Sequence, residues 1–244
     1  MATDLSRPAF YALAAGGWRD YVTLLHPPYT AWHLSFVAIG AALTPDFSVS
    51  RLLPTLAAFF LAVGIGAHAL DELHGRPLKT RIPDAMLIAL AAASLVVAGG
   101  IGTVGAVVVD PWIGAFVAAG SFIVVAYTVE LFAGRFHTDV WFALSWGSFP
   151  VLTGFFAAAG TISLAAVLAA LFAFALSLAQ RHLSTRVRDV RRRVTRVSGT
   201  VTRQDGSVEP ITAADLARAE EAALRALSGA TVALAAALVA MRLA

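Results

Sequence analysis

The sequence contains no cysteine, and only 14% of its 244 residues are charged. The absence of cysteine excludes disulfides, thiolate metal sites and cysteine nucleophiles. A soluble domain would be about 25% charged, whereas 59% of this chain is hydrophobic, so water is not the solvent for most of its surface. The apolar runs also lack the alternation of membrane-barrel strands. We therefore expect an all-α fold, a polytopic helical membrane bundle.

Several apolar runs approach the length of about 20 residues that a helix needs to cross a bilayer. They fall at residues 29–44, 52–73, 84–99, 111–132, 140–160, 162–183 and 228–243. Residues 99–109 either extend the third span or form a re-entrant turn. Residues 213–227 are strongly helix-forming, and we expect them to continue the helix of the last span. The sequence thus predicts about seven spans in a single membrane domain, residues 1–244.

Basic residues are distributed unequally between the two ends of these spans. With a cytoplasmic N-terminus, most lie on the inner side, including the cluster at residues 181–203, and only Arg51 and Arg242 lie outside. Cytoplasmic loops carry the excess of Lys and Arg. We therefore expect an integral membrane protein, of the cytoplasmic membrane if the cell is prokaryotic, with its N-terminus in the cytoplasm and its C-terminus outside.

The longest polar segment, residues 184–212, is expected to form a cytoplasmic loop that caps the bundle. It contains the basic run RVRDVRRRVTRV, and a small hairpin is expected with its turn at Asp205 and Gly206. The basic run has no interleaved aromatic residues and lies between two spans. Its expected partner is therefore membrane lipid and not nucleic acid, and it could act as a lid over a site on the cytoplasmic face.

Histidines and carboxylates recur at one depth, near the cytoplasmic ends of the predicted spans. His68 and Glu72 are four residues apart and share a helix face. Ionisable groups at membrane depth are costly and normally face the bundle interior, and imidazole with carboxylate suits transition metals. The pattern predicts a metal site, with iron favoured over manganese or zinc. The candidate ligands are His33, His68, Glu72, Glu130, His137 and His182.

Plainer interpretations stand beside this one. Histidines tolerate the membrane interface, which is the expected role of His26 and His74, and Asp71 is placed to replace Glu72 as a ligand. Tyr127 and Trp146 are candidates for the lining of a hydrophobic substrate groove, although aromatic residues in spans more often pack or form an interfacial belt.

Several stretches resemble the UbiA-type prenyltransferase superfamily. They are HPPYTAWHLSFVAIGAAL from residue 26, AHALDELHGRPLKTRIP from residue 67, AYTVELFAGRFHTDVWFALSWGSFPVLTGF from residue 126, and residues 178–193. The resemblance implies a ring of helices around a central cavity that opens laterally to lipid, with a cytoplasmic cap. It also implies transfer of isoprenoid chains from diphosphates to acceptors, with Mg²⁺ held by two Asp-rich motifs. Family members usually have nine spans, more than this chain.

The sequence differs from the family at the positions that carry the family's chemistry. His68 and Glu72 stand where the first motif has Asn and Asp, and Glu130 follows Tyr127 where a basic residue is common. Of the second motif only Asp189 remains. Because Mg²⁺ prefers oxygen ligands, and a carboxylate at position 130 would repel a diphosphate, the family reaction does not follow from the fold alone.

Three hypotheses result. The leading one is a membrane oxidoreductase whose His- and Glu-ligated transition metal, possibly a di-iron-like centre, acts on a long-chain isoprenoid or lipid. The alternative is a divergent Mg²⁺-dependent prenyltransferase or prenyl-diphosphate lyase. The third is a lipid-binding protein without enzymatic activity. In the alternative, the residues that hold Mg²⁺ and diphosphate would be Asp71, Arg76, Lys79, Arg186, Arg188 and Asp189. The substrate, the reaction and the oligomeric state stay open.

Overall fold

The computed structural model describes residues 7–244, and most of them are helical. The elements are α1 (Trp18–Leu24), α2 (Pro27–Ala42), α3 (Val49–Phe59), η1 (Phe60–Ala67), α4 (His68–Leu73), α5 (Asp84–Val108), α6 (Ile113–Thr128), α7 (Leu131–Gly134), α8 (Asp139–Ala143), η2 (Leu144–Ser148), α9 (Phe149–Ala159), α10 (Leu164–Arg193), β1 (Thr200–Thr202), β2 (Val208–Pro210) and α11 (Arg218–Leu243). The segments η1 and η2 are π-helical. They join α3 to α4 and α8 to α9.

Within the described residues, five helices are long and apolar enough to cross a membrane. They are Val49–Leu73, Asp84–Val108, Asp139–Ala159, Leu164–Arg193 and Arg218–Leu243. A shorter apolar helix, Ile113–Thr128, accompanies them. The expected seven spans are thus reproduced only in part. One reason is length: α2 has 16 residues, which at 1.5 Å per residue extends about 24 Å, less than the hydrocarbon core of about 30 Å.

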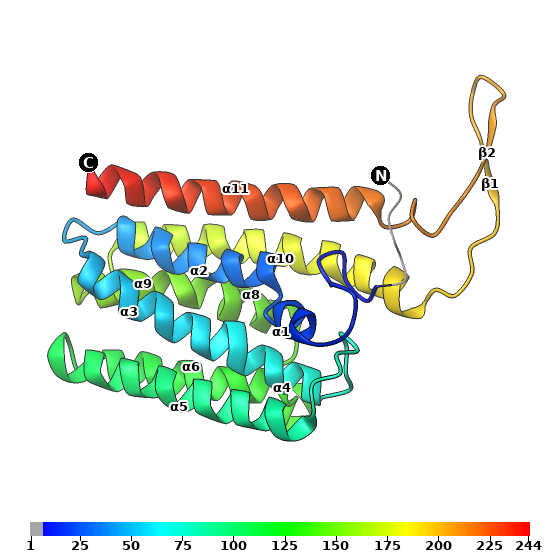
Figure 1. The fold of residues 1–244 in the computed structure, drawn as a ribbon. Coiled ribbons are helices and arrows are strands. Elements are labelled where there is room, and N and C mark those ends of the chain that lie inside the picture. The colour runs from blue at the N-terminus through cyan, green and yellow to red at the C-terminus, as the bar shows by residue number, and fades with distance from the viewer. Residues whose placement is uncertain (1–6) are drawn as a thin grey trace.

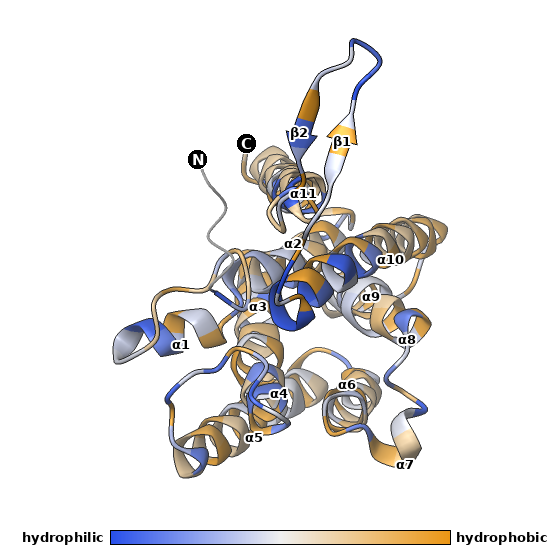
Figure 2. Ribbon diagram, turned by 90° about the vertical axis from the view of Figure 1, so that its right-hand side faces the viewer, coloured by the Kyte–Doolittle hydropathy of each residue, from blue (hydrophilic) through white to orange (hydrophobic). Residues whose placement is uncertain are grey.

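The long helices run side by side, with the β-hairpin and the described start of the chain at one end and the C-terminus at the other (Figure 1). Viewed along the helices, α5 and α6 lie on the side of the bundle away from α11, and α2 lies between them and α11 (Figure 2). The faces of α5 that point outward carry exposed Val96, Val104 and Val107. An apolar exposed face of this extent indicates contact with lipid.

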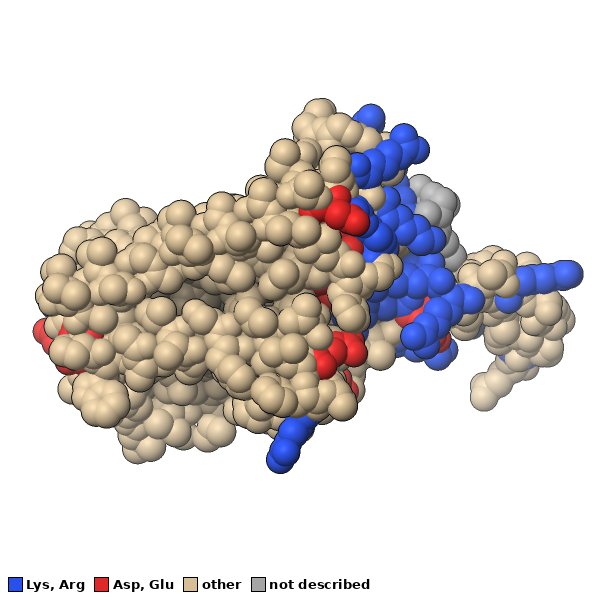
Figure 3. All heavy atoms as spheres, turned by 90° about the horizontal axis from the view of Figure 1, so that it is seen from below, with Lys and Arg blue, Asp and Glu red and all other residues tan. Residues whose placement is uncertain are grey.

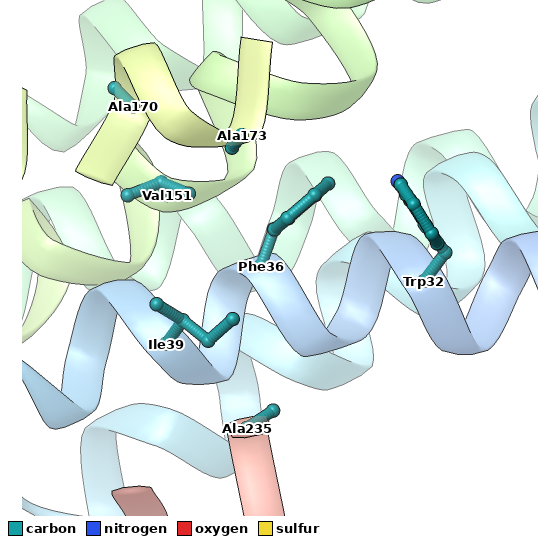
Figure 4. Close-up of a cluster of buried hydrophobic side chains, with 7 residues drawn as sticks. All are labelled: Trp32, Phe36, Ile39, Val151, Ala170, Ala173 and Ala235. Carbon is teal, nitrogen blue, oxygen red and sulfur yellow. The ribbon is translucent and has the colours of Figure 1, made fainter. Parts of the chain in front are cut away.

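Helix α2 packs closely against α9 because two glycines remove side chains from the interface. A Cβ added at Gly40 would lie 2.1 Å from the carbonyl oxygen of Val151, and one added at Gly154 would lie 2.2 Å from that of Val37. The two backbones therefore approach each other as closely as in other membrane helix pairs that have small residues at their contact. Beside this contact, Trp32 and the fully buried Phe36 pack in a cluster that also draws on α10 and α11 (Figure 4).

Residues 99–109 extend the third predicted span, because α5 is one continuous helix to Val108. The expected cap, residues 184–212, is shorter than anticipated. Helix α10 continues through Arg193, since Val187 and Val190 recur on one face and pack against Leu224 of α11. The segment that leaves the bundle is therefore 194–217.

The hairpin within this segment confirms the expected turn. Strands β1 and β2 pair antiparallel, with Thr202 opposite Val208, and the turn between them contains Asp205 and Gly206. Helix α11 then begins at Arg218 and continues without interruption into the last apolar run. The expected continuous helix is confirmed from Arg218 on, whereas residues 213–217 form turns before it. The hairpin projects away from the helices (Figure 1).

Candidate functional site

A polar cavity of about 520 Å³ lies at the end of the bundle that carries the basic residues. Lys and Arg side chains gather at this end, around the end of α10 (Figure 3). The wall is built by the segment around Tyr11, by α2, by η1 and α4, by the end of α6, by η2 and by α10. Both π-helical segments contribute to it, through Val63 and Trp146, and such irregular turns are frequent at functional sites.

Several histidines in this wall share one hydrogen-bonding arrangement. The Nδ1 of His33 donates to the carbonyl oxygen of Trp146 at 2.9 Å, and that of His68 donates to Gly64 at 3.1 Å. His137 donates in the same way to Tyr127 at 2.9 Å. A carbonyl only accepts, so each Nδ1 carries the proton. In the neutral form of each ring, Nε2 then keeps a lone pair.

His26 belongs to the cavity wall, although the sequence suggested only an interfacial role for it. Its ring stacks on that of His68 with centroids 4.0 Å apart, and its Nδ1 lies 2.8 Å from the hydroxyl of Tyr11. Burial and the neighbouring His68 lower the pKa of His26 well below 6.5. Burial likewise raises the pKa of Tyr11 well above 10. Near neutral pH, an uncharged phenol thus faces an uncharged imidazole.

Glu72 does not face this cavity. Its carboxylate is fully buried and accepts three hydrogen bonds from the loop after α4. They come from the amide of Leu78 at 2.9 Å, the amide of Thr80 at 2.8 Å and the hydroxyl of Thr80 at 2.9 Å. Glu72 therefore anchors a loop. The helical spacing of four residues from His68 does not bring the two side chains to one site.

The remaining candidate metal ligands are divided between the cavity wall and the surface. The side chain of His182 is 69% exposed and lies 3.7 Å from Asp139, outside the cavity wall. Glu130 lines the cavity at its outer edge, with an oxygen 3.9 Å from Nδ1 of His137. Within residues 7–244, no three His, Asp or Glu side chains come together in a way that could hold a metal ion. Four of the six candidates, His33, His68, Glu130 and His137, line the same cavity, whereas Glu72 and His182 do not.

The residues of the diphosphate hypothesis are divided in the same way. Asp71 and Arg188 line the cavity. Arg76 instead pairs with Asp84, and Lys79 is exposed in the loop that Glu72 anchors. Arg186 and Asp189 lie on α10 outside the cavity wall.

The sequence analysis missed further arginines of α10 that line the cavity. Arg181 and Arg192 stand seven residues before and four residues after Arg188, so all three share a helix face. Arg181 pairs with Asp139 at 2.9 Å. Among the described residues, neither Arg188 nor Arg192 has a carboxylate within salt-bridge distance, and their hydrogen bonds go to Thr185 and to the carbonyl of Pro8. The helical period of the basic run was the signal that could have revealed this face.

An apolar groove of about 730 Å³ adjoins the polar cavity. It runs along α3, η1, α5, α6 and α9, where Phe116 and Phe149 form part of its wall. Val63 and Trp146 line both the groove and the cavity. Tyr127 lines the cavity beside them, with its ring stacked on His137 at 4.4 Å and edge-on to Trp146 at 5.7 Å. A polar compartment and an apolar compartment thus meet at one shared wall.

Comparison of the chain with protein-family models, with curated protein sequences and with solved structures gives no match. What this site binds must therefore follow from its own geometry and charge.

Proposed function

We propose that this protein binds a long-chain amphiphile of the isoprenoid kind, with an anionic head group in the polar cavity and its chain in the adjoining groove. We further propose that it uses a prenyl diphosphate, as a divergent prenyltransferase or prenyl-diphosphate lyase of the UbiA type. We infer from the positive-inside rule that the cavity faces the cytoplasm, with the N-terminus inside and the C-terminus outside.

One observation carries this proposal: two arginines that form no salt bridge with any described carboxylate face a cavity whose wall continues into an apolar groove. Arg188 and Arg192 are partly buried, and cationic groups near membrane depth normally have a partner. Guanidinium groups bind phosphate oxygens through charge-assisted hydrogen bonds. A diphosphate would supply an anion that both arginines can bind, and its hydrocarbon chain would pass Val63 and Trp146 into the groove.

The chemistry of a prenyl diphosphate fits these residues. In transfer or elimination the carbon–oxygen bond to the diphosphate breaks, and the electron pair leaves with the diphosphate. The carbocation then bonds to an acceptor that releases a proton, or itself loses a proton to form an alkene. Arg188 and Arg192 would stabilise the charge that develops on the leaving group. Trp146 would orient the chain at the boundary between the two compartments.

The protein would supply only a small part of the ligands of a bound Mg²⁺ ion. Mg²⁺ is commonly bound by one or two carboxylates together with substrate phosphates. Asp71 faces the cavity and would hold the ion, which when bound neutralises charge on the diphosphate. Glu130 lies at the edge, where it is half exposed, so solvent weakens its repulsion of an anion.

A transition-metal centre fits less well. His33 and His68 present Nε2 lone pairs after their Nδ1 protons are fixed by carbonyls, an arrangement also found around metal ions. Glu72 and His182 are turned away, however, and the described residues provide no group of three ligands. We therefore derive no step through such a metal, and the oxidoreductase hypothesis stays a prediction from the sequence.

The test is the affinity of the purified protein in detergent for geranylgeranyl diphosphate and for geranylgeraniol, which differ only in the anionic head. We expect the diphosphate to bind at least tenfold more tightly. Hydrogen bonds to charged groups contribute about 1.5–3 kcal/mol each, so Arg188→Gln and Arg192→Gln should each weaken diphosphate binding by about tenfold or more. Arg196→Gln removes the same charge from an exposed position outside the cavity and should change affinity little. Equal affinity for the two ligands, or equal effects of all three substitutions, would refute the proposal.

A further inference from the structure

The apolar groove begins at a defined layer of side chains. Val63, Leu95, Val124 and Trp146 pack in one cluster, and all four line the groove. Val63 and Trp146 also line the polar cavity. This layer therefore marks the boundary at which a chain leaves the cavity and enters the groove.

The far end of the groove is bordered by a charged side chain and by a helix contact. The start of α3 and the turn between α5 and α6 lie at the same end of the bundle (Figure 1), so Arg51 of α3 and Ile113 of α6 line this end. The guanidinium of Arg51 donates to the carbonyl oxygen of Ala158 at 2.6 Å, which ties α3 to α9. A Cβ added at Gly105 would lie 3.5 Å from Ile113, so α5 and α6 are in contact here. A hydrocarbon chain that continued past Arg51 would have to desolvate a charged group, which is unfavourable.

The helices that line the groove give its length. On α6 the lining residues Val124 and Ile113 are eleven residues apart, a rise of about 16 Å. On α5 the lining residues Leu95 and Val108 are thirteen residues apart, a rise of about 20 Å. The two helices thus agree on a groove that is about 16–20 Å long.

This length corresponds to a definite number of isoprene units. A protein backbone, which has three bonds per residue, extends by at most about 3.3–3.6 Å per residue. An isoprene unit adds four bonds to a chain, so by the same geometry it extends the chain by about 4.5 Å. A groove of about 16–20 Å therefore takes about four units in extended form.

We propose that the groove holds a prenyl chain of about four isoprene units, or about twenty carbon atoms, with the last unit beside Arg51 and Ile113. This inference rests on the proposed function, because it assumes that Arg188 and Arg192 hold the diphosphate in the polar cavity. It adds the length of the chain and the place where the chain ends.

Photochemical labelling of the purified protein in detergent locates the end of the chain. The probes are geranylgeranyl diphosphate and geranyl diphosphate, each with a diazirine on its last isoprene unit, and the labelled peptides are identified by mass spectrometry. The longer probe should label the far end of the groove, at residues 50–55 and 108–113. The shorter probe should label the middle of the groove, near Ala62 and Gly120. If both probes label the same residues, or if the longer probe labels only residues outside the groove, the length inference is overturned.

An independent measurement uses a substitution that blocks the groove partway along its length. Ala58 lines the groove and precedes Val63 by five residues, a rise of about 7 Å. Side chains on a helix point toward its N-terminus, so the ring in Ala58→Phe would lie toward Arg51 and leave space for about two units. Because overpacking is costly, this variant should bind geranylgeranyl diphosphate about fivefold or more weakly than the wild type. Its affinity for geranyl diphosphate should change by less than about twofold.

Ala57→Phe is the matched control. Ala57 is the neighbouring residue on α3, is exposed and does not line the groove, so this variant should bind both diphosphates as the wild type does. Equal weakening of both ligands by Ala58→Phe, or the same loss in Ala57→Phe, would contradict the length inference and leave the proposed function intact. If the wild type binds neither diphosphate, the proposed function fails, and the length inference fails with it.

Discussion

Substitution of Glu72 by Gln separates a structural role from a role as a metal ligand. The sequence favours the ligand, since His68 lies one helical turn away. The structure instead places the carboxylate among three donors of the loop after α4, with no exposed area. If the carboxylate anchors the loop, Glu72→Gln should lower stability whether or not any metal is present.

The magnitude follows from the three hydrogen bonds. In the Gln variant one carboxylate oxygen becomes an amide nitrogen that faces either the amide of Leu78 or that of Thr80. At least one charge-assisted bond is lost, worth about 1.5–3 kcal/mol, and the remaining bonds become neutral and about half as strong. A total of about 3 kcal/mol is expected. For a chain of this length each kcal/mol lowers Tm by about 2–4 °C, so Tm should fall by about 6–12 °C.

Thermal unfolding in detergent, followed by tryptophan fluorescence at a fixed scan rate, measures this shift. Glu130→Gln is the control, because the side chain of Glu130 is 48% exposed and accepts no hydrogen bond from another described side chain; its Tm should change by less than about 3 °C. A Glu72→Gln protein with the Tm of the wild type would refute the anchoring role. If that protein also lost a bound transition metal, the ligand hypothesis would be supported instead.

Three further predictions concern orientation, packing and pH. A cysteine introduced at Ser198, in a chain without native cysteine, should react with impermeant thiol reagents only from the cytoplasmic side; labelling from the opposite side would reverse the proposed topology. Gly40→Ala should destabilise the protein by about 1–3 kcal/mol or more, since the added Cβ would lie 2.1 Å from a carbonyl oxygen. Gly99→Ala, in open space within α5, should instead stabilise it by about 0.5–1 kcal/mol, and equal effects on Tm would contradict the packing argument. Because the pKa of His26 is lowered in the folded protein, the unfolded chain binds a proton that the folded protein excludes. Stability is therefore full above pH 6.5 and falls as the pH drops below this value. His26→Gln should reduce the fall in Tm between pH 6.5 and 5, and an unchanged pH profile of Tm would contradict this role of His26.

The helical membrane character of the chain follows from composition and run length, and these features are local. The same is true of the hairpin turn at Asp205 and Gly206 and of the continuous α11, which the structure confirms. Residues 184–193 were assigned to the cap because of their charge, whereas the structure has them in α10. The spacing of Val187 and Val190 keeps these residues helical, since it gives them an apolar face against α11.

The candidate site was harder to predict because it depends on side-chain direction. Two side chains at the same membrane depth can still point in different directions. The carboxylate of Glu72, for example, is directed into the loop after α4, where it accepts a hydrogen bond from the amide of Thr80. His26 was set aside as an interfacial residue, yet its left-handed backbone at φ 45° begins α2 and directs the ring onto His68. No periodicity in a single sequence specifies such a turn, because it is determined by the contact between segments distant in the chain.

The arginines of α10 lead to a last prediction about metal dependence. The resemblance proposed from the sequence implies that Mg²⁺ held by carboxylates neutralises the diphosphate. In the described part of this cavity only Asp71 and Glu130 bring a carboxylate to the wall, whereas Arg188 and Arg192 face it without carboxylate partners. A guanidinium stays charged at any physiological pH, so the anion should be held mainly by arginine. Removal of Mg²⁺ with EDTA should then weaken geranylgeranyl diphosphate binding less than the double substitution of Arg188 and Arg192 by Gln does. Calorimetry on both proteins, with and without EDTA, measures the two effects directly. A larger loss on chelation than on removal of both arginines would mean that Mg²⁺ on Asp71, and not α10, holds the head group.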